Sequence, residues 1–253
     1  MIRVIVFLVL FMSSLFLGAQ TISTDRPDQT EGSTSVPQGS LQIEAGFLHE
    51  LSEIDDIKVL HVLVPTTLFR YGVAKGLELR LVGQFESFRN RETHQTVDGL
   101  SNVELGAKLE LLNKEEIKTK IAFLSHAVLP IGSDELSNNK LGTVNKLSIS
   151  HELNAKLSLG YNVGYDYFGE GSGNFNYSMA LGLSIYDNFG VYIEPYGEVV
   201  DFKTHLASFD AGITYLLADN IQLDFSSGVG LNYDMDYIAV GFSINIPKKD
   251  RHQ

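Results

Sequence analysis

The sequence has no cysteine, few basic residues and, after residue 20, no long apolar run. The absence of cysteine suits an oxidising compartment and a fold that needs no disulfide. No two histidines have ligand spacing, and no phosphate-cradling loop precedes a helix, so we predict neither a metal nor a cofactor. The 19 basic residues face 31 acidic ones. This balance argues against nucleic acid as a partner, because basic patches carry that affinity.

The N-terminus has the pattern of a secretory signal. Met1-Ile-Arg3 gives a short positive start, Val4–Phe11 is apolar, and Leu17-Gly-Ala19 forms a small-residue cleavage site. We therefore expect residues 1–19 to be a cleavable signal peptide; the alternative is an uncleaved inner-membrane anchor. No later segment reaches about 18 consecutive apolar residues, so no membrane-spanning helix is expected there.

From residue 39 onwards, apolar and small or polar residues alternate in units of roughly ten to twelve residues, each ending in a turn. Residues 175–185 show the pattern most clearly: FNYSMALGLSI. A strand places successive side chains on opposite faces, so each unit has one apolar and one polar face. Such repetition behind a secretory signal predicts an all-β, antiparallel transmembrane β-barrel over residues 39–246 with lipid outside and a polar lumen. A water-soluble all-β fold with core aromatics is the alternative.

We predict about twelve strands, near residues 40–50, 57–72, 77–88, 100–112, 117–130, 144–153, 156–168, 175–186, 189–201, 206–217, 220–233 and 237–246. Connections after even-numbered strands are short, whereas several others, such as 89–98 and 131–143, are longer. Outer-membrane barrels have short periplasmic turns, so both termini are expected to be periplasmic. Aromatic residues near strand ends, including Tyr233 and Tyr237 toward the outer rim, would form the interfacial girdles.

The polar face carries charges of both signs. The candidates for lining the lumen are Glu44, Arg80, Glu86, Glu104, Lys108, Asp166, Glu194, Asp210 and Asp224. The wider set adds Glu78, Gln84, Glu110, Lys118, Lys120, Lys146, Glu152 and Glu198. Lone charges are costly in apolar surroundings, so these groups should pair or face water. They either line a narrow, mostly acidic path or form a salt-bridged network that braces the wall.

Pro65 and Pro195 fall inside predicted strands. Proline cannot donate to the strand ladder, so each is expected to mark a kink or bulge. A kink either opens a lateral passage toward lipid or adjusts the curvature of the wall.

Residues 20–38 differ in kind from the repeated units. They are polar and rich in turn-forming residues. Asp25, Arg26, Asp28 and Glu31 could pair with lumen charges and plug or constrict the periplasmic mouth; otherwise the segment is a disordered tail. Residues 247–253 form a basic C-terminal tail.

Several runs resemble the outer-membrane barrel family known as putative MetA-pathway of phenol degradation. They are TDRPDQTEGSTSVPQGSLQIEAGF from residue 24, LFRYGVAKGLELRL at 68–81, GLSNVELGAKLELL at 99–112, LPIGS at 129–133, and FDAGITYLLADNIQLDFSSGVGLN with YIAVGFSINI near the end. The resemblance implies a transporter-type barrel of Gram-negative bacteria for small compounds, including aromatic or hydrophobic ones. One departure is the last strand, which ends on Asn245-Ile246 rather than on an aromatic residue.

The sequence therefore favours an outer-membrane channel or transporter for small solutes. Membrane lipid, an unidentified solute and the barrel-assembly machinery are its expected partners. An outer-membrane lipid-modifying enzyme is one alternative, but it needs a serine and a histidine on one face. In Ser125-His126 and Ser150-His151 the two residues are adjacent, so in a strand they point to opposite faces, and we predict no enzyme activity. A structural barrel without transport is the other alternative.

Overall fold

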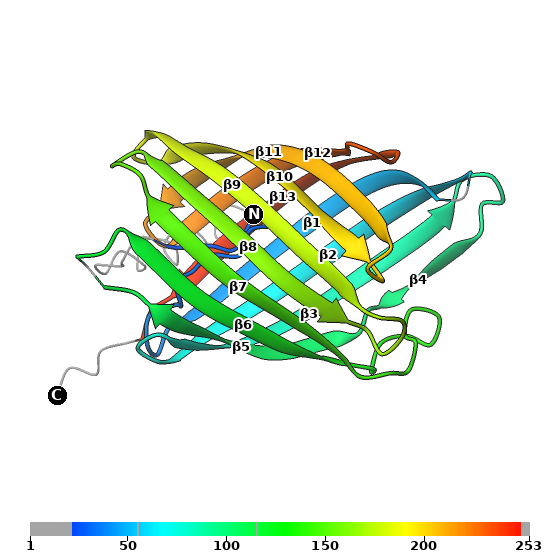
Figure 1. The fold of residues 1–253 in the computed structure, drawn as a ribbon, viewed down its shortest axis with the longest axis horizontal. Helices are drawn as coiled ribbons and strands as arrows, with labels where there is room; N and C mark the ends of the chain where they lie inside the picture. The colour runs from blue at the N-terminus through cyan, green and yellow to red at the C-terminus, as the bar shows by residue number, and fades with distance from the viewer. Residues whose placement is uncertain (1–21, 55, 115, 249–253) are drawn as a thin grey trace, which may run out of the picture.

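The computed structural model describes residues 22–54, 56–114 and 116–248 (Figure 1). The predicted signal peptide at 1–19 and most of the basic tail at 247–253 lie outside the described residues. Within the described part of the chain, no helix is long and apolar enough to cross a membrane.

The described chain is built from strands. Their bounds are β1 Leu41–Ile54, β2 Ile57–Ala74, β3 Leu77–Asn90, β4 Thr96–Leu100, β5 Val103–Leu112, β6 Thr119–Leu129, β7 Gly142–Glu152, β8 Leu157–Tyr167, β9 Asn174–Tyr186, β10 Phe189–Val200, β11 Thr204–Ala218, β12 Ile221–Gly230 and β13 Met235–Ile246.

These strands close into one antiparallel barrel. Each strand pairs with its neighbour in sequence, and β1 closes the ring on β13 with Leu41 opposite Ile246. β4 and β5 both pair with β3 and are separated only by Ser101 and Asn102, so they act as two parts of one wall strand. The barrel therefore has twelve wall strands, as the alternation predicted.

Both described ends of the chain lie at the same end of the barrel, because β1 begins opposite the last residue of β13. At that end, 75–76, 187–188 and 219–220 are two-residue connections, while 130–141 and 168–173 at the other end are longer. The predicted long connection at 89–98 is shorter than expected. The pair Arg89 and Thr96 still belongs to the β3–β4 ladder, so only residues 91–95 remain as a turn.

The two faces of the wall divide as the alternation predicted. Outward apolar side chains remain exposed, among them Leu181 at 37%, Ile193 at 48% and Phe225 at 40%. Inward positions hold buried polar groups such as Ser148 and Ser243. A water-soluble barrel would have the reverse arrangement, so the alternative of a water-soluble fold is not supported and the exposed band fits acyl chains.

The two prolines behave differently. At Pro65 the register of β2 against β3 shifts between Leu63 and Thr66, which is a β-bulge. Pro195 causes no such shift: it stays opposite Phe209 in β11, and the pairing with β9 has the same register at Ile193 as at Tyr196. Pro195 therefore marks no bulge, because the missing N–H interrupts a ladder without adding a residue, and the kink expected there stays a prediction.

A charge on the outward face should destabilise the barrel according to its depth in the bilayer. We expect Ile193→Arg, in the middle of β10, to lower the free energy of unfolding by about 2–4 kcal/mol, because arginine is costly at the bilayer midplane. Leu217→Arg, one residue from the end of β11, should cost about 0–1 kcal/mol. Urea titration in phospholipid vesicles measures both; equal costs would contradict the assigned membrane face.

Candidate functional site

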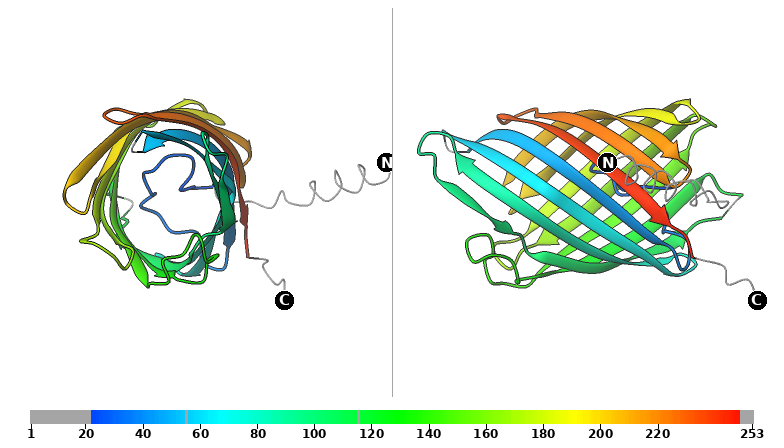
Figure 2. Two further views of the ribbon diagram at one scale, coloured as in Figure 1. Left: turned by 90° about the vertical axis from the view of Figure 1, so that its right-hand side faces the viewer. Right: turned by 180° about the vertical axis from the view of Figure 1, so that it is seen from behind.

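The N-terminal segment, residues 22–38, lies inside the barrel (Figure 2). It begins at the end that holds the termini, where the Ile22 N–H donates to the Asp219 carbonyl. It returns to the same end, where Gln38 forms a bridge to Gly72. Gly39 then turns the chain into β1 with a φ of 82°, a backbone conformation that favours glycine. The segment is therefore a loop across the lumen that starts and ends at one rim.

Wall side chains satisfy the backbone of this irregular segment. The Asp25 and Arg26 N–H groups donate to Glu44 at 2.9 and 3.0 Å. The Gln29 N–H donates to Glu194 at 2.7 Å. The remaining wall acceptors are Asn162 for Glu31, Glu110 for Ser35 and Glu78 for Val36. Buried N–H groups need partners, and carboxylate acceptors give strong bonds, so the wall binds the segment largely through its main chain.

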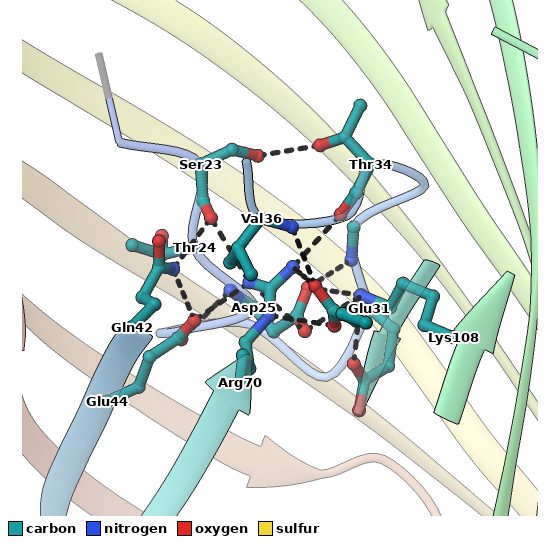
Figure 3. Close-up of polar contacts among 12 residues, drawn as sticks. Ser23, Thr24, Asp25, Glu31, Thr34, Val36, Gln42, Glu44, Arg70 and Lys108 are labelled. Carbon is teal, nitrogen blue, oxygen red and sulfur yellow. Dashed lines mark hydrogen bonds and ion pairs between the residues drawn. The ribbon is translucent and has the colours of Figure 1, made fainter. Parts of the chain in front are cut away.

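The centre of the site is a group of three buried cations, Arg70 on β2, Arg80 on β3 and Lys108 on β5, called here the basic cluster. Figure 3 shows Arg70 and Lys108 around Asp25. The Asp25 carboxylate lies among them. It is 2.5 Å from Arg80 Nη1, 2.8 Å from Lys108 Nζ and 3.4 Å from Arg70 Nη1. Glu31 adds a second carboxylate at 2.8 Å from Arg80 Nη2. Two acidic side chains of the segment thus enter one basic site.

Wall carboxylates share the same cations. Glu44 lies 2.9 Å from Arg70 Nη1, and Glu78 lies 2.9 Å from both Arg70 Nε and Arg80 Nη1. Strand register brings these groups together, since Arg70 is opposite Arg80 and Glu78 is opposite Lys108. Buried charges are costly unless they are paired. Burial alone would raise the pKa of Asp25, but the charges of Arg70, Lys108 and Arg80 hold it well below its usual value.

Arg26 forms a second anchor, on a different part of the wall. Its guanidinium meets Asp224 on β12 through two contacts, Nη2 to Oδ1 at 3.0 Å and Nε to Oδ2 at 3.3 Å. Gly46 and Gly241, paired between β1 and β13, lie beneath it. A Cβ at either glycine would come within 2.2 or 2.3 Å of the guanidinium, so the missing side chains make room for Arg26.

Two further wall acids, Glu194 on β10 and Asp210 on β11, form another part of the site. Glu194 accepts from the Thr30 hydroxyl at 2.5 Å as well as from the Gln29 N–H, and Asp210 accepts from the Tyr237 hydroxyl at 2.5 Å. Burial and the neighbouring Glu194 carboxylate raise the pKa of Asp28. The surroundings therefore stabilise the ionised form of Asp28 less than they stabilise the ionised form of Asp25.

Tyr237 is a correction to the predicted outer girdle. It is 4% exposed and faces the lumen, where it contacts Asp210. The alternation of the strand predicts this position, because Ile238 points outward and the preceding Tyr237 must therefore point inward.

The other predicted lumen residues lie farther toward the rim opposite the termini. Glu86 contacts His61 and Ser101, and Glu104 contacts His126 at 2.7 Å. Asp166 accepts from Asn176 at 2.8 Å. Arg70 was missed by the sequence analysis. Its flanking residues, Phe69 and Tyr71, point outward, and this alternation was the signal that could have placed it in the lumen.

Cavities lie on both sides of the N-terminal segment. The outer cavity, of about 230 Å³, has Gln29 in its lining together with Lys146, Asp166, Tyr196 and Glu198. The cavity at the terminal side, of about 640 Å³, is lined by Ser23 and residues 34–38 of the segment and by Lys75, Glu110 and Lys120 of the wall. The segment therefore separates two solvent spaces.

The histidine and serine neighbours have separate surroundings. Ser125 donates to Asn145, whereas His126 contacts Arg80 and Glu104. Ser150 contacts Ser33, whereas His151 contacts Thr119 and Tyr161. Within the described ranges, no group of three or more acidic, histidine or cysteine side chains is arranged to hold a metal.

Asp25 and Asp28 should differ in their effect on stability. Asp25→Asn leaves the basic cluster without its central carboxylate and should cost about 3–5 kcal/mol, as breaking a buried ion pair does. Asp28→Asn removes a carboxylate that faces Glu194, so the free energy of unfolding should stay equal or rise. Urea unfolding in vesicles tests both, and a larger loss for Asp28→Asn would contradict the assignment.

Docking of the segment should strengthen on mild acidification. Because docking raises the pKa of Asp28, protonation of Asp28 stabilises the docked segment. This stabilisation is complete below pH 3.8, the ordinary pKa of aspartate, and is lost as the pH rises through the raised pKa. The lowered pKa of Asp25 means that its contribution persists above 3.8 and is lost only at lower pH. Glu194 and Asp210 of the wall face Asp28 and take part in the same titration.

Hydrogen exchange of amides 25–36, corrected for intrinsic rates, measures this docking. Protection should increase from neutral pH toward 3.8, and Asp28→Asn should reduce the increase. Protection that falls throughout this range would show that Asp25 dominates.

Solved structures share this fold. An outer membrane channel from Pseudomonas putida F1 superposes with a TM-score of 0.74 at 11% identity, covering 87% of this chain and 100% of that one. The KdgM porin in complex with disordered oligogalacturonate gives 0.54 at 11% identity, with 81% and 99% covered. The β domain of the Bordetella autotransporter BrkA gives 0.52 at 9% identity, with 82% and 99% covered. At these identities the likeness concerns the fold alone.

No curated protein matches the sequence. The sequence pattern of one family, described as "Putative MetA-pathway of phenol degradation", matches residues 24–246. This range contains both the N-terminal segment that crosses the lumen from residue 24 and every strand of the barrel. The chain, as its opening motif predicted, belongs to that family.

Proposed function

We propose that this protein is an outer-membrane channel for small solutes whose lumen is closed by the N-terminal segment. One observation carries the proposal. A segment with no strand ladder of its own lies between two cavities and is held by hydrogen bonds and ion pairs alone. Such contacts can exchange for solute or water without breaking the barrel, so the segment can act as a plug.

The fold supports the location and the orientation. The apolar outer face requires a bilayer, and only closed barrels and helices satisfy their backbone there. Residues 1–19 would direct export, and the rim with the two-residue turns and the termini would face the periplasm. A channel and a porin are among the solved structures with this fold.

The lining of the lumen favours polar solutes. The outer cavity is lined by Lys146, Asp166 and Glu198, and its aromatic residues are Tyr177, Tyr196 and Tyr233. Neither of the two cavities beside the segment is lined mainly by apolar side chains. The aromatic or hydrophobic substrate implied by the family resemblance therefore remains a prediction, to which the cavity chemistry adds no support.

Neither alternative function has a comparable observation in its favour. Ser125 and Ser150 lie apart from the ring nitrogens of His126 and His151, so an acyl-transfer site lacks its nucleophile–base contact. The buried ion pairs would also brace a purely structural barrel. Conductance measurements distinguish a structural barrel from a channel.

Removal of the segment should open the channel. The mature protein should show a small, intermittent conductance in planar bilayers, whereas a variant lacking residues 22–38 should conduct continuously and pass small sugars in liposome swelling. Glu170→Gln, which changes an exposed acid in the 168–173 connection, serves as the matched control and should behave as the unmodified protein. A barrel that stays sealed after the deletion would establish the structural role instead.

A further inference from the structure

Two consecutive residues of the N-terminal segment carry opposite charges and form ion pairs with different parts of the wall. The Asp25 carboxylate enters the basic cluster on β2, β3 and β5, and the Arg26 guanidinium binds Asp224 on β12. Around the ring these two parts are separated by β13 and β1 on one side and by β6 to β11 on the other. The two parts of the lumen wall therefore carry opposite charges, and Asp25 and Arg26 carry the charges that match them.

The basic side has a surplus of positive charge once the segment is left out. Arg70, Arg80 and Lys108 face two wall carboxylates, Glu44 and Glu78. Asp25 and Glu31 of the segment supply the remaining negative charge. Withdrawal of the segment leaves one uncompensated positive charge in a buried site, which is costly unless another anion replaces the carboxylates.

The acidic side has the opposite surplus. It consists of Glu194, Asp210 and Asp224, all at most 7% exposed. Among the ion pairs of the described residues, Asp224 is paired only with Arg26, and Glu194 and Asp210 are paired with no base. Asp210 Oδ1 and the Tyr192 hydroxyl are buried without a hydrogen-bond partner within the described part of the chain. Buried groups of this kind lack the partners that such atoms normally have, so this side can accept a cationic donor.

We propose that the channel recognises small zwitterionic solutes, which carry a carboxylate and a guanidinium or ammonium group in one molecule, and that Asp25 and Arg26 occupy their place in the closed state. The carboxylate of the solute binds the basic cluster, and its cationic group binds Asp224, on the acidic side of the wall. This inference rests on the proposed role of the segment as a plug. A zwitterion replaces both charges of the segment at once, whereas a simple anion or cation replaces only one.

One cationic and one anionic side chain of the segment are partly exposed, so a solute can begin to replace their contacts. The Arg26 and Glu31 side chains are each 18% exposed, whereas Arg80 and Asp224 beneath them are buried. Glu31 is bound to Asn162, which lines the outer cavity beside Gln29. A solute in that cavity therefore meets the more exposed contacts of the segment first and reaches Asp25 last.

The native chain allows a clean reporter because it has no cysteine. Ser33 lies in the segment, is 3% exposed and contacts Ser150 on β7. Ser33→Cys in the otherwise unmodified mature protein, reconstituted in vesicles, gives one thiol whose labelling rate reports release of the segment. The probes are L-arginine, agmatine, which is arginine without the carboxylate, and glutarate, which carries two carboxylates and no cation.

L-Arginine should raise the labelling rate by about tenfold, the effect of outcompeting one charge-assisted contact. Agmatine and glutarate at the same concentration and ionic strength should leave the rate unchanged. Release by agmatine alone would show that the acidic lumen responds to any cation, and release by all three would show a general salt effect. Either result overturns the proposal.

A second measurement covers the wall itself. The double variant Asp25→Asn/Arg26→Gln removes the two side-chain charges that the solute would replace and leaves the wall intact, so calorimetry should show L-arginine binding about tenfold more tightly than to the unmodified protein. The matched control Glu170→Gln should bind as the unmodified protein does. Unchanged affinity in the double variant would overturn the proposal.

The two proposals fail in different ways. If deletion of residues 22–38 opens the pore, but L-arginine neither raises the labelling rate of the Ser33→Cys variant nor binds more tightly to the double variant, the channel stands and the solute class is wrong. If L-arginine binds and releases the segment while the deleted barrel stays sealed, the binding site stands and the channel function is wrong.

Discussion

The interior of this barrel depends on the contact between one carboxylate and three buried cations. Arg70, Arg80 and Lys108 are almost fully removed from water, and Asp25 is within ion-pair distance of each. Charges at this depth are tolerated only when they are paired and hydrogen-bonded. The position of the N-terminal segment follows from this requirement, because the two wall carboxylates, Glu44 and Glu78, leave one of the three positive charges uncompensated.

The wall and the segment use two kinds of recognition. Glu44, Glu78 and Glu194 accept backbone N–H groups, which every non-proline residue offers, so these contacts hold the path of the segment with little regard to its sequence. Asp25 and Arg26 add charges whose sign and order matter. The first kind of contact fixes where the segment runs, and the second sets what could displace it.

Most of the barrel could be predicted from the sequence, because a strand of period two that faces lipid on one side has a strong apolar alternation. The same rule placed Glu44, Arg80, Lys108, Glu194 and Asp224 on the inner face. It would also have placed Arg70 and Tyr237 there had it been applied consistently across strands β2 and β13. The absence of Arg70 from the predicted lumen and the placement of Tyr237 in the outer girdle were therefore avoidable from the sequence alone.

Other features were beyond the reach of the alternation. The path of residues 22–38 is irregular and depends on partners from strands all around the ring, so no local pattern encodes it. The space that Gly46 and Gly241 leave for Arg26 depends on the pairing of the first strand with the last. The break between β4 and β5 and the undisturbed register at Pro195 depend on neighbouring ladders, which a single sequence does not show.

The location of those two glycines has a consequence for biogenesis. Gly46 belongs to β1 and Gly241 to β13, so the recess beneath the Arg26 guanidinium comes into being only when the two ends of the sheet meet. A nascent, open sheet offers one half of that recess and therefore no complete seat for the guanidinium. The seat is thus complete only in the closed ring, and the Arg26 guanidinium bound in it lies over the joint between the first and the last strand.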